Sequence, residues 1–415
     1  MKRRFLMALM PATITAVILA GCAGSSQQFG GDFSGTGASA PLQSVEGQAL
    51  PALGQLAPAN GQIIGRGPVR VAMLLPQSAS GFGALAAENF TNAASLALRE
   101  FDENTLHIVI KDTAGTQEGA TSATQEALSE GAEIILGPVF STTVPAVVSV
   151  AKPAGVPVIT FSNSASVGSR GTYVFGFTPG PGIQRVIEYA GSQGRKSYAA
   201  LLPNNALGTL AEAAFRQAVA NSGSRIVSIA RYGGAEGEAE ARAREVGALA
   251  ESGQIDAVFV PDAADVAPRL IATVKQSAPS NTNLLFIGSG QWDDPRIFRN
   301  AGLAGTVYPA PERDGFNQFA QRYNGAFGKP PIRLASLGYD AASLTVVLSQ
   351  NFRDQRFAEN NLTRSSGFKG VVDGTFRLDP NGQVSRALAV YEVTASGPRI
   401  VSPAVRKFSK TAFNN

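Results

Sequence analysis

Short apolar runs alternate with longer amphipathic stretches along most of this 415-residue chain. Val69–Leu75 is apolar at all but one position, which is typical of a strand in a parallel sheet that is covered on both faces. A Gly/Ser loop follows at 76–83, and an Ala-rich helix is expected over 84–101. The same order repeats and predicts helices over 116–130 and 143–152 and strands at Leu106–Lys111, Glu133–Gly137, Val156–Phe161 and Tyr173–Phe177. Such connections are right-handed crossovers that build a doubly wound sheet.

After Pro179 the alternation starts again and predicts a second sheet of the same type. Its strands are expected at Ser197–Leu202, Arg225–Ala230, Ala257–Pro261, Asn283–Gly288 and Gly305–Pro309, with helices over 182–193, 208–221, 238–252 and 264–277. Two more helices are expected over 316–327 and 336–352. The turn sequence Asp379–Gly382 then predicts a hairpin between Gly374–Leu378 and Ala387–Glu392. The expected fold class is α/β, with two doubly wound, Rossmann-like lobes.

The N-terminus has the pattern of an export signal. Basic residues at 2–4 precede an apolar run over 5–20, and Leu19-Ala20-Gly21 leads into Cys22. This ending resembles a bacterial lipobox, which implies a signal peptide over 1–21 and a lipid on Cys22. Ala23, rather than Asp, follows the cysteine, which by resemblance to Gram-negative lipoproteins favours the outer membrane over the inner one. An ordinary secretory signal is the alternative.

Residues 22–66 are rich in Gly, Ser, Gln, Ala and Pro and show no sustained periodicity. A segment of this composition buries too little apolar surface to order itself. We therefore predict a flexible tether there, which as a coil of roughly 40 residues spans on the order of 35 Å. The folded body is expected to begin near Pro68.

Composition excludes several classes of site. The chain contains one Cys and one His, so no intrachain disulfide, His/Cys zinc site or iron–sulfur cluster is possible. The net charge is +4 with Lys and Arg spread along the chain, which does not fit nucleic-acid binding. We predict no metal and no cofactor.

Two enzyme hypotheses are weak. Gly81–Ala86 matches the glycine pattern of dinucleotide sites, but five residues separate it from the preceding strand, whereas that motif requires the glycines in the tight turn itself. A hydrolase would have to use His107, which lies inside an apolar strand, and no nucleophile-elbow motif is present. We expect that the protein is not an enzyme.

An ordered series of short motifs then resembles a known family. The motifs are Val71–Pro76, Gly137–Ser141, Gly155–Ile159, Phe161–Ser164 and the late group Phe368–Gly370, Gly374–Phe376, Asp379 and Gly382. Together they resemble the type I periplasmic binding proteins of the leucine/isoleucine/valine-binding kind. The resemblance implies two lobes joined by a three-crossover hinge, with lobe 1 at 68–180 plus 312–350, lobe 2 at 181–311 plus 351–402, and a tail at 403–415.

In such sheets ligands bind beyond the carboxyl ends of the strands, where helix N-termini favour an anion. The first lobe offers hydroxyl, amide and aromatic groups in these loops: Ser78, Ser80, Phe140, Ser141, Ser162, Asn163 and Ser164. The family places its amino-acid ligand against the corresponding loops, which implies Ser80, Ser141, Asn163 and Ser164 as the leading candidates. Each of these residues is as well suited to capping a helix.

In the second lobe the candidates are Asn204, Leu207, Asp262 and Trp292. Leu207 stands where relatives often have a tyrosine that closes over the ligand, a departure that argues against a bound α-amino acid. Asp262 suits either a ligand ammonium or the cap of helix 264–277. Trp292 suits either stacking on a ligand or a place in a core or hinge.

The resemblance implies a lipid-anchored periplasmic protein that binds a small polar solute (an amino acid, a peptide or a muropeptide-like molecule) for an ABC permease. The alternative is an outer-membrane lipoprotein that activates a penicillin-binding protein, because lipid-anchored members of this superfamily resemble such activators. In that case the partner is a peptidoglycan synthase. Both alternatives place the protein at a membrane through Cys22.

Overall fold

The computed structural model describes residues 58–408. Cys22, the predicted signal peptide and most of the predicted tether lie outside the described residues. Among the described residues, no helix combines the length and apolar character that crossing a membrane requires.

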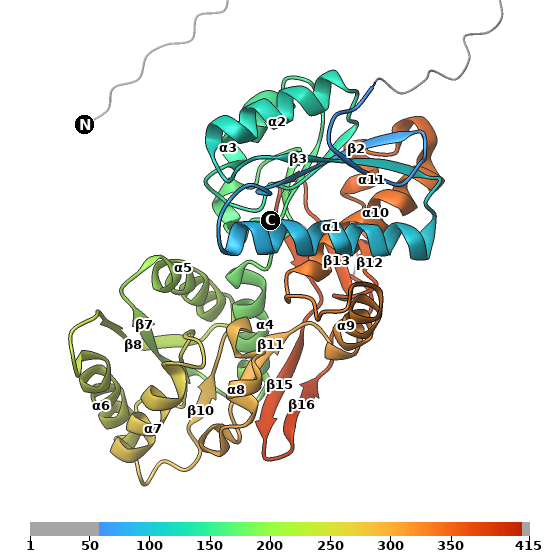
Figure 1. Ribbon diagram of the computed structural model, residues 1–415. Helices are drawn as coiled ribbons and strands as arrows, with labels where there is room; N and C mark the ends of the chain where they lie inside the picture. The colour runs from blue at the N-terminus through green and yellow to red at the C-terminus, as the bar shows by residue number, and fades with distance from the viewer. Residues whose placement is uncertain (1–57, 409–415) are drawn as a thin grey trace, which may run out of the picture. The chain divides into compact units, whose positions relative to one another are not determined.

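The first sheet has six strands in the order β1-β3-β2-β4-β5-β6, and β2 to β6 run parallel (Figure 1). Strand β2 is buried throughout because its alternate side chains face two layers of helices. Met73 packs in the core that contains α1, whereas Leu74 packs under α2 and α3. The elements are β1 Gln62–Ile64, β2 Val69–Leu75, α1 Phe82–Phe101, β3 Leu106–Asp112, α2 Gln117–Ser129, β4 Ile134–Leu136, α3 Val144–Ala151, β5 Val158–Thr160 and β6 Thr172–Val174.

The second sheet has seven strands in the order β16-β15-β11-β10-β9-β7-β8. Strands β7 to β11 are parallel, and the antiparallel pair β15 and β16 extends the sheet beyond β11. Leu201 of β7 packs toward α6 and α7, whereas Leu202 packs toward α4 and α5. The elements are α4 Pro179–Ser192, β7 Ser197–Pro203, α5 Ala206–Asn221, β8 Arg225–Tyr232, α6 Glu238–Glu251, β9 Ala257–Phe259, α7 Ala267–Ser277, β10 Leu285–Ile287, α8 Pro295–Phe298, β11 Val307–Ala310, β15 Ala389–Thr394 and β16 Gly397–Ser402.

The remaining elements complete the first core. Helices α1 and α10 lie side by side, and Phe376 of a small antiparallel sheet packs edge-on against Phe175 with ring centroids 4.9 Å apart. The chain therefore passes between the two cores three times, after β6, after β11 and after β14. These elements are α9 Arg313–Phe327, α10 Ala335–Phe352, α11 Glu359–Leu362, β12 Phe368–Lys369, β13 Thr375–Leu378 and β14 Val384–Arg386.

The third passage comes later than expected. Residues 351–386 were expected in lobe 2, but Leu362, Phe368 and Phe376 all pack in the core of the first sheet. The chain joins the second sheet only at β15. The apolar pattern of 351–386 predicts burial, but it does not specify which of two similar cores receives these side chains.

The turn of the predicted hairpin is confirmed, but the strand that follows it in the hairpin is not the predicted one. Gly382 N–H donates to Asp379 O at 2.8 Å, as the turn sequence indicated. However, β13 pairs with β14, and most of the expected arm 387–392 is β15, which pairs with β11. Strand β15 suits that place because Tyr391 faces one core of the second sheet and Val390 faces the other.

Part of the predicted tether belongs to the folded body. Strand β1 pairs antiparallel with β3, and Lys111 Nζ donates to Asn60 O at 2.7 Å. Lys111 also forms an ion pair with Glu130 at 2.7 Å, and the Lys111 side chain is only 3% exposed. Three residues are too few for a periodic signal, which is why the sequence pattern missed this strand. At the other end, Phe408 of the predicted tail lies under the Arg377 guanidinium, 4.7 Å from the ring centroid.

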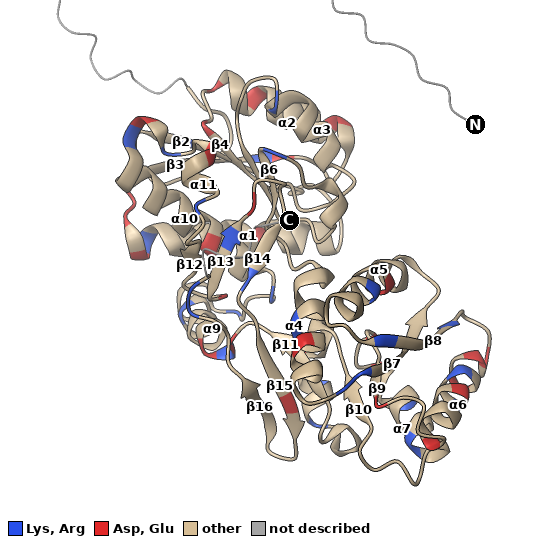
Figure 2. Cartoon of the chain, turned by 180° about the vertical axis from the view of Figure 1, so that it is seen from behind, with Lys and Arg blue, Asp and Glu red and all other residues tan. Residues whose placement is uncertain are grey.

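Charged residues of both signs are interspersed over the molecule. In Figure 2, Lys and Arg alternate with Asp and Glu on α6 rather than forming one basic face. Ion pairs such as Arg269–Glu240 and Arg242–Glu245 join these side chains. This mixture is typical of a solvated protein surface.

Candidate ligand-binding site

A cavity of about 480 Å³ lies where the three passages of the chain come together. The first passage contributes Phe177 and Thr178, the second contributes Pro309 and Pro311, and the third contributes Arg386 and Leu388. Loops at the carboxyl ends of strands in the second sheet supply Pro261, Ser289, Gly290, Gln291 and Asp293. The cavity is thus lined by residues from both cores, as expected for a ligand site at the edge of parallel sheets.

Two guanidinium groups line the cavity and flank the same aromatic ring. Arg333, which precedes α10, has its Cζ 4.8 Å from the centroid of Phe177, and the Cζ of Arg386 on β14 is 5.1 Å from it. Arg333 also lies over Phe316 at 4.5 Å, and Arg386 lies over Phe175 at 4.5 Å. Stacking of this kind fixes the planes of the guanidinium groups and favours their positive charge.

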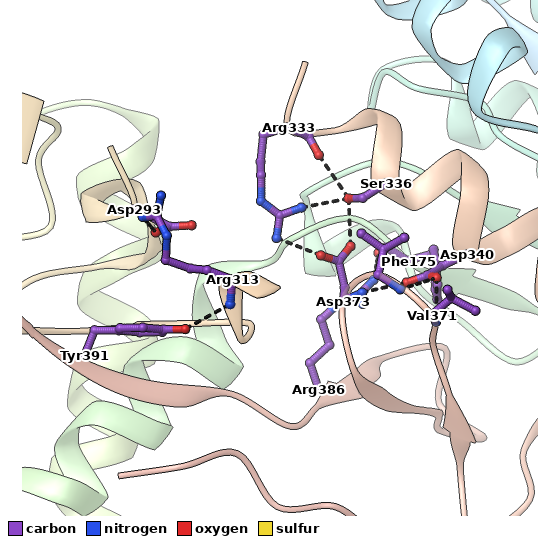
Figure 3. A network of polar contacts seen from close by, with 11 residues as sticks. Phe175, Asp293, Arg313, Arg333, Ser336, Asp340, Val371, Asp373, Arg386 and Tyr391 are labelled. Carbon is purple, nitrogen blue, oxygen red and sulfur yellow. Dashed lines mark hydrogen bonds and ion pairs between the residues drawn. The ribbon is translucent and has the colours of Figure 1, made fainter. Parts of the chain in front are cut away.

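Behind these cations is a buried polar network (Figure 3). Arg333 Nη2 donates to Asp373 Oδ1 at 2.7 Å, and Ser336 Oγ donates to Asp373 Oδ2 at 2.7 Å. Asp340 on α10 accepts hydrogen bonds from the backbone N–H groups of residues 371, 372 and 373 at 2.9 to 3.0 Å. Burial, with Asp373 beside it, raises the pKa of Asp340 to about 7.

Arg386 is the least satisfied member of this cluster. Its Nη2 donates to Phe175 O, but Nε and Nη1 are buried and have no acceptor within the described part of the chain. Burial lowers the pKa of Arg386, although a guanidinium still keeps its proton. A buried charged donor without an acceptor is costly and therefore needs an explanation.

The lining contains one acidic residue within the described chain, Asp293, and it is already paired. Arg313 Nη1 lies 2.7 Å from Asp293 Oδ1, and the Arg313 backbone N–H donates to the Tyr391 hydroxyl at 3.0 Å (Figure 3). The Arg313 guanidinium also lies over the Phe298 ring at 4.5 Å. These contacts hold the Asp293 carboxylate to the second passage of the chain.

Two helix N-termini also face the cavity. Helix α4 begins at Pro179 with no side-chain cap, and its residues Pro181, Gly182 and Ile183 line the cavity. Helix α5 contributes Leu207 and Ala211. The positive ends of both helix dipoles add to the charge of the two arginines.

The structure brings only part of the predicted residue set to this cavity. Of the first-lobe candidates Asn163 lines it, and of the second-lobe candidates Leu207 lines it. The other loop candidates do not line it: Ser78, Ser80, Phe140, Ser141, Ser162, Ser164 and Asn204. Several of these have local roles, as where Ser162 Oγ accepts from Ser164 N–H at 3.1 Å.

Asp262 and Trp292 form a buried pair in the second core. Trp292 is fully buried, and its Nε1–H donates to Asp262 O at 2.8 Å. The Asp262 carboxylate accepts from the Tyr232 hydroxyl, and burial raises the pKa of Asp262. Neither side chain lines the cavity, and the Trp292 ring packs in the second core. Asp262 also does not cap α7, whose N-cap is Val266.

His107 lies on β3 beside Arg70 of β2, as the apolar pattern predicted. Burial and the nearby Arg70 charge lower the pKa of His107, which favours the neutral imidazole. It does not line the cavity described above.

The two arginines were not predicted from the sequence because they lie 53 positions apart, on connections rather than at strand ends. The available signal was indirect. Arg386 is charged and directly precedes the apolar run 387–391, and Arg333 follows the pair Pro330-Pro331. Neither pattern indicates a binding residue without the fold.

Comparisons with known proteins agree with this architecture. A model of the periplasmic binding protein family matches residues 68–398. Among curated proteins, an uncharacterised protein of Rickettsia prowazekii (strain Madrid E) is 25% identical over 135 residues, which are 32% of this chain. The match spans only 35% of that relative's own length.

Among solved structures, a branched-chain amino acid ABC transporter periplasmic ligand-binding protein from Burkholderia xenovorans LB400 superposes with a TM-score of 0.65 at 18% identity, over 81% of this chain and 95% of that one. A solute-binding protein of an ABC transporter from Rhodopseudomonas palustris BisB5, in complex with 3,4-dihydroxybenzoic acid, gives 0.55 at 17% identity over 82% and 97%. At these identities the structural likeness shows the fold alone. With the family match over most of its length, the chain belongs to the periplasmic binding protein family and has the type I fold.

Proposed function

We propose that this protein binds a small solute in the cavity at the three chain passages and delivers it to an ABC permease. The observation that carries the proposal is the cavity itself, which has about 480 Å³ and is lined by residues of both cores. That volume lies within the usual range for small-molecule sites. The family match and the fold shared with transporter substrate-binding proteins support the same function.

Contacts from both cores make the site suited to a ligand-dependent closure. A solute that touches Asn163 on one side and Leu207 on the other gains contacts only when both sides approach it. Binding of this kind favours one arrangement of the lobes over others by its difference in affinity.

The first test is native mass spectrometry of the purified protein as isolated, which should show a bound small molecule. Thermal unfolding should then be followed with a panel of amino acids, organic acids, short peptides and muropeptides. A true ligand at about a hundredfold above its Kd should raise the Tm by about 5 °C. No adduct and no shift across the panel would contradict the proposal.

A pair of variants on helix α5 locates the site. Leu207 lines the cavity, whereas Leu210, three residues on, is 42% exposed and does not line it. Leu207→Trp fills part of the cavity and should weaken binding by about tenfold or more. Leu210→Trp is the matched control and should bind as the unchanged protein does. Equal affinity in both variants would place the ligand elsewhere.

A second function is favoured by the N-terminal sequence, in which Ala23 follows Cys22. An outer-membrane lipoprotein is far from an inner-membrane permease but close to the cell wall, as an activator of a penicillin-binding protein must be. This function predicts that a peptidoglycan synthase is recovered with the protein from solubilised membranes. If no synthase is recovered and the mass spectrum shows a solute adduct, only the transport function remains supported.

A further inference from the structure

We propose that the solute bound here is an organic acid with an apolar body and no cationic group, its carboxylate held by Arg333 and Arg386. This inference rests on the proposed function, since it names the ligand class of the same cavity. It differs from the amino-acid ligand that the sequence resemblance implies.

The charge of Arg386 favours an anionic ligand. Arg386 lines the cavity, and within the described residues its guanidinium donates to the carbonyl oxygen of Phe175 and makes no ion pair. Nε and Nη1 are enclosed by protein, so a ligand gains from the charge of this group rather than from those two donors. A carboxylate in the cavity would supply the negative charge that the protein leaves out.

The cations are also held in place before a ligand arrives. Arg333 is fixed by Asp373 and Ser336 at 2.7 Å each, and Phe177 lies against both guanidinium groups. Because these side chains are already ordered, a bound anion pays little of the usual entropy cost of ordering its partners. The N-terminus of α4, which has no side-chain cap, adds a positive dipole at the same cavity.

A ligand ammonium would find no free carboxylate among the described residues that line the cavity. Asp293 is paired with Arg313 at 2.7 Å. Asp262 lies in the second core, bonded to Tyr232 and outside the lining. A ligand ammonium would meet two guanidinium groups and two helix N-termini instead, and like charges at such distances repel.

The rest of the lining suits an apolar body. Ile183, Leu207, Ala211, Pro309 and Leu388 present aliphatic surface to the cavity. Their side chains can bury a branched aliphatic or aromatic group, and such burial is favourable in proportion to the apolar area removed from water. Guanidinium charge together with aliphatic surface in one cavity therefore defines the class.

The test compares three ligands that share one apolar body, by isothermal titration calorimetry on the purified full chain. The ligands are 4-methylpentanoate, its amide 4-methylpentanamide, and leucine, which adds an ammonium to the acid. Benzoate, benzamide and phenylalanine form a second set. We expect each acid to bind roughly tenfold to a hundredfold more tightly than its amide and its amino acid.

An amino acid that binds as tightly as its acid, or an amide that does so, would overturn the inference and leave the proposed function intact. If neither set binds at millimolar concentration, the inference also fails. Native mass spectrometry then tests whether the protein binds any small solute. A different adduct would support the proposed function, and the absence of any adduct would contradict it.

Variants locate the carboxylate. Arg386→Met removes the charge and keeps a long side chain, and it should weaken binding of the acid by about tenfold while leaving binding of the amide unchanged. Arg399→Met, at an exposed side chain of strand β16, is the control and should change neither. Circular dichroism and the Tm of each free variant show that it folds. Equal loss for acid and amide would contradict the assignment.

Discussion

Asp340 is a buried carboxyl group placed behind the candidate anion site. It faces Asp373, Arg386 and the backbone N–H groups of residues 371–373, and Arg333 and Ser336 contact the same Asp373. Burial is the largest cause of its raised pKa of about 7, and the Asp373 charge adds to it. The charge of this group therefore changes within the physiological pH range.

This titration predicts that binding of a carboxylate weakens as the pH rises from about 6 to about 8. Ionised Asp340 adds a negative charge beside Arg386, which reduces the attraction for an anion by an estimated severalfold to about tenfold. The ligand itself stays ionised over this range, so it does not contribute to the change. Calorimetric titrations at the two pH values measure the effect.

Asp340→Asn is the matched control, because it keeps the shape of the side chain and removes the titration. Its affinity should be constant over the same range. A pH dependence that persists in Asp340→Asn would assign the effect to another group. Since the pKa of Asp340 lies above its ordinary value of 3.8, the unfolded chain ionises this group more readily than the folded chain. The free energy of unfolding should therefore fall as the pH rises from about 4 to about 7, and less so in the variant.

At this scale sequence reasoning found positions but seldom roles. Asn163 and Leu207, which line the cavity, were predicted as binding residues because loops after strands and helix N-termini follow from the order of elements. Trp292 was found as an aromatic in such a loop, yet its ring is buried against the second core. A sequence shows that a side chain is large and apolar, but not which side of a loop it packs on.

Among the elements, the turn between β13 and β14 is tightly constrained. Gly382 has a φ of +85°, and a Cβ there would lie 2.3 to 2.5 Å from backbone atoms of Ser169 and Thr172. Gly382 O also accepts from Val174 N–H at 2.9 Å. The turn thus closes directly onto the end of β6.

Replacing this glycine should destabilise the protein more than replacing another glycine of the same backbone class. Gly374, in the same small sheet, has a φ of +74° and open space around its Cβ position. We expect Gly374→Ala to lower the free energy of unfolding by about 1 kcal/mol, from backbone strain alone. Gly382→Ala should lower it by roughly 2 to 4 kcal/mol, because the methyl group also meets backbone atoms. Urea unfolding of both variants measures the difference, and equal losses would mean that the turn can move away from β6.

The same turn shows what patterns predict about elements. Its residue types indicated a turn, and the structure has one, but strand pairing depends on which neighbours lie alongside. The three-residue strand β14 has no periodicity of its own, whereas 387–392 has a long apolar run that fits a hairpin arm equally well. Only the open edge of β11 in the second sheet decides where that run pairs.

For the whole molecule, the twofold repetition of strands and helices predicted two sheets because each parallel sheet needs helices on both faces. The presence of two sheets, one after the other along the chain, and of most helices follows from that repetition. The third passage was predicted too early in the chain. Phe368 and Phe376 pack in the first core, but their apolar character fits either core equally well. Long-range placement of this kind depends on shape complementarity, which a single sequence does not display.

The N-terminus makes a prediction for the whole molecule that is independent of the cavity. If Cys22 carries the lipid, Cys22→Ser should move the protein from the membrane fraction to the soluble periplasmic fraction, since each buried CH₂ of an acyl chain contributes about 0.8 kcal/mol to membrane binding. The purified variant should bind the same acid with unchanged affinity, because the cavity residues lie between 163 and 388. Fractionation followed by immunoblotting measures the first effect and calorimetry the second. A variant that stays in the membrane fraction would show that another segment provides the anchor.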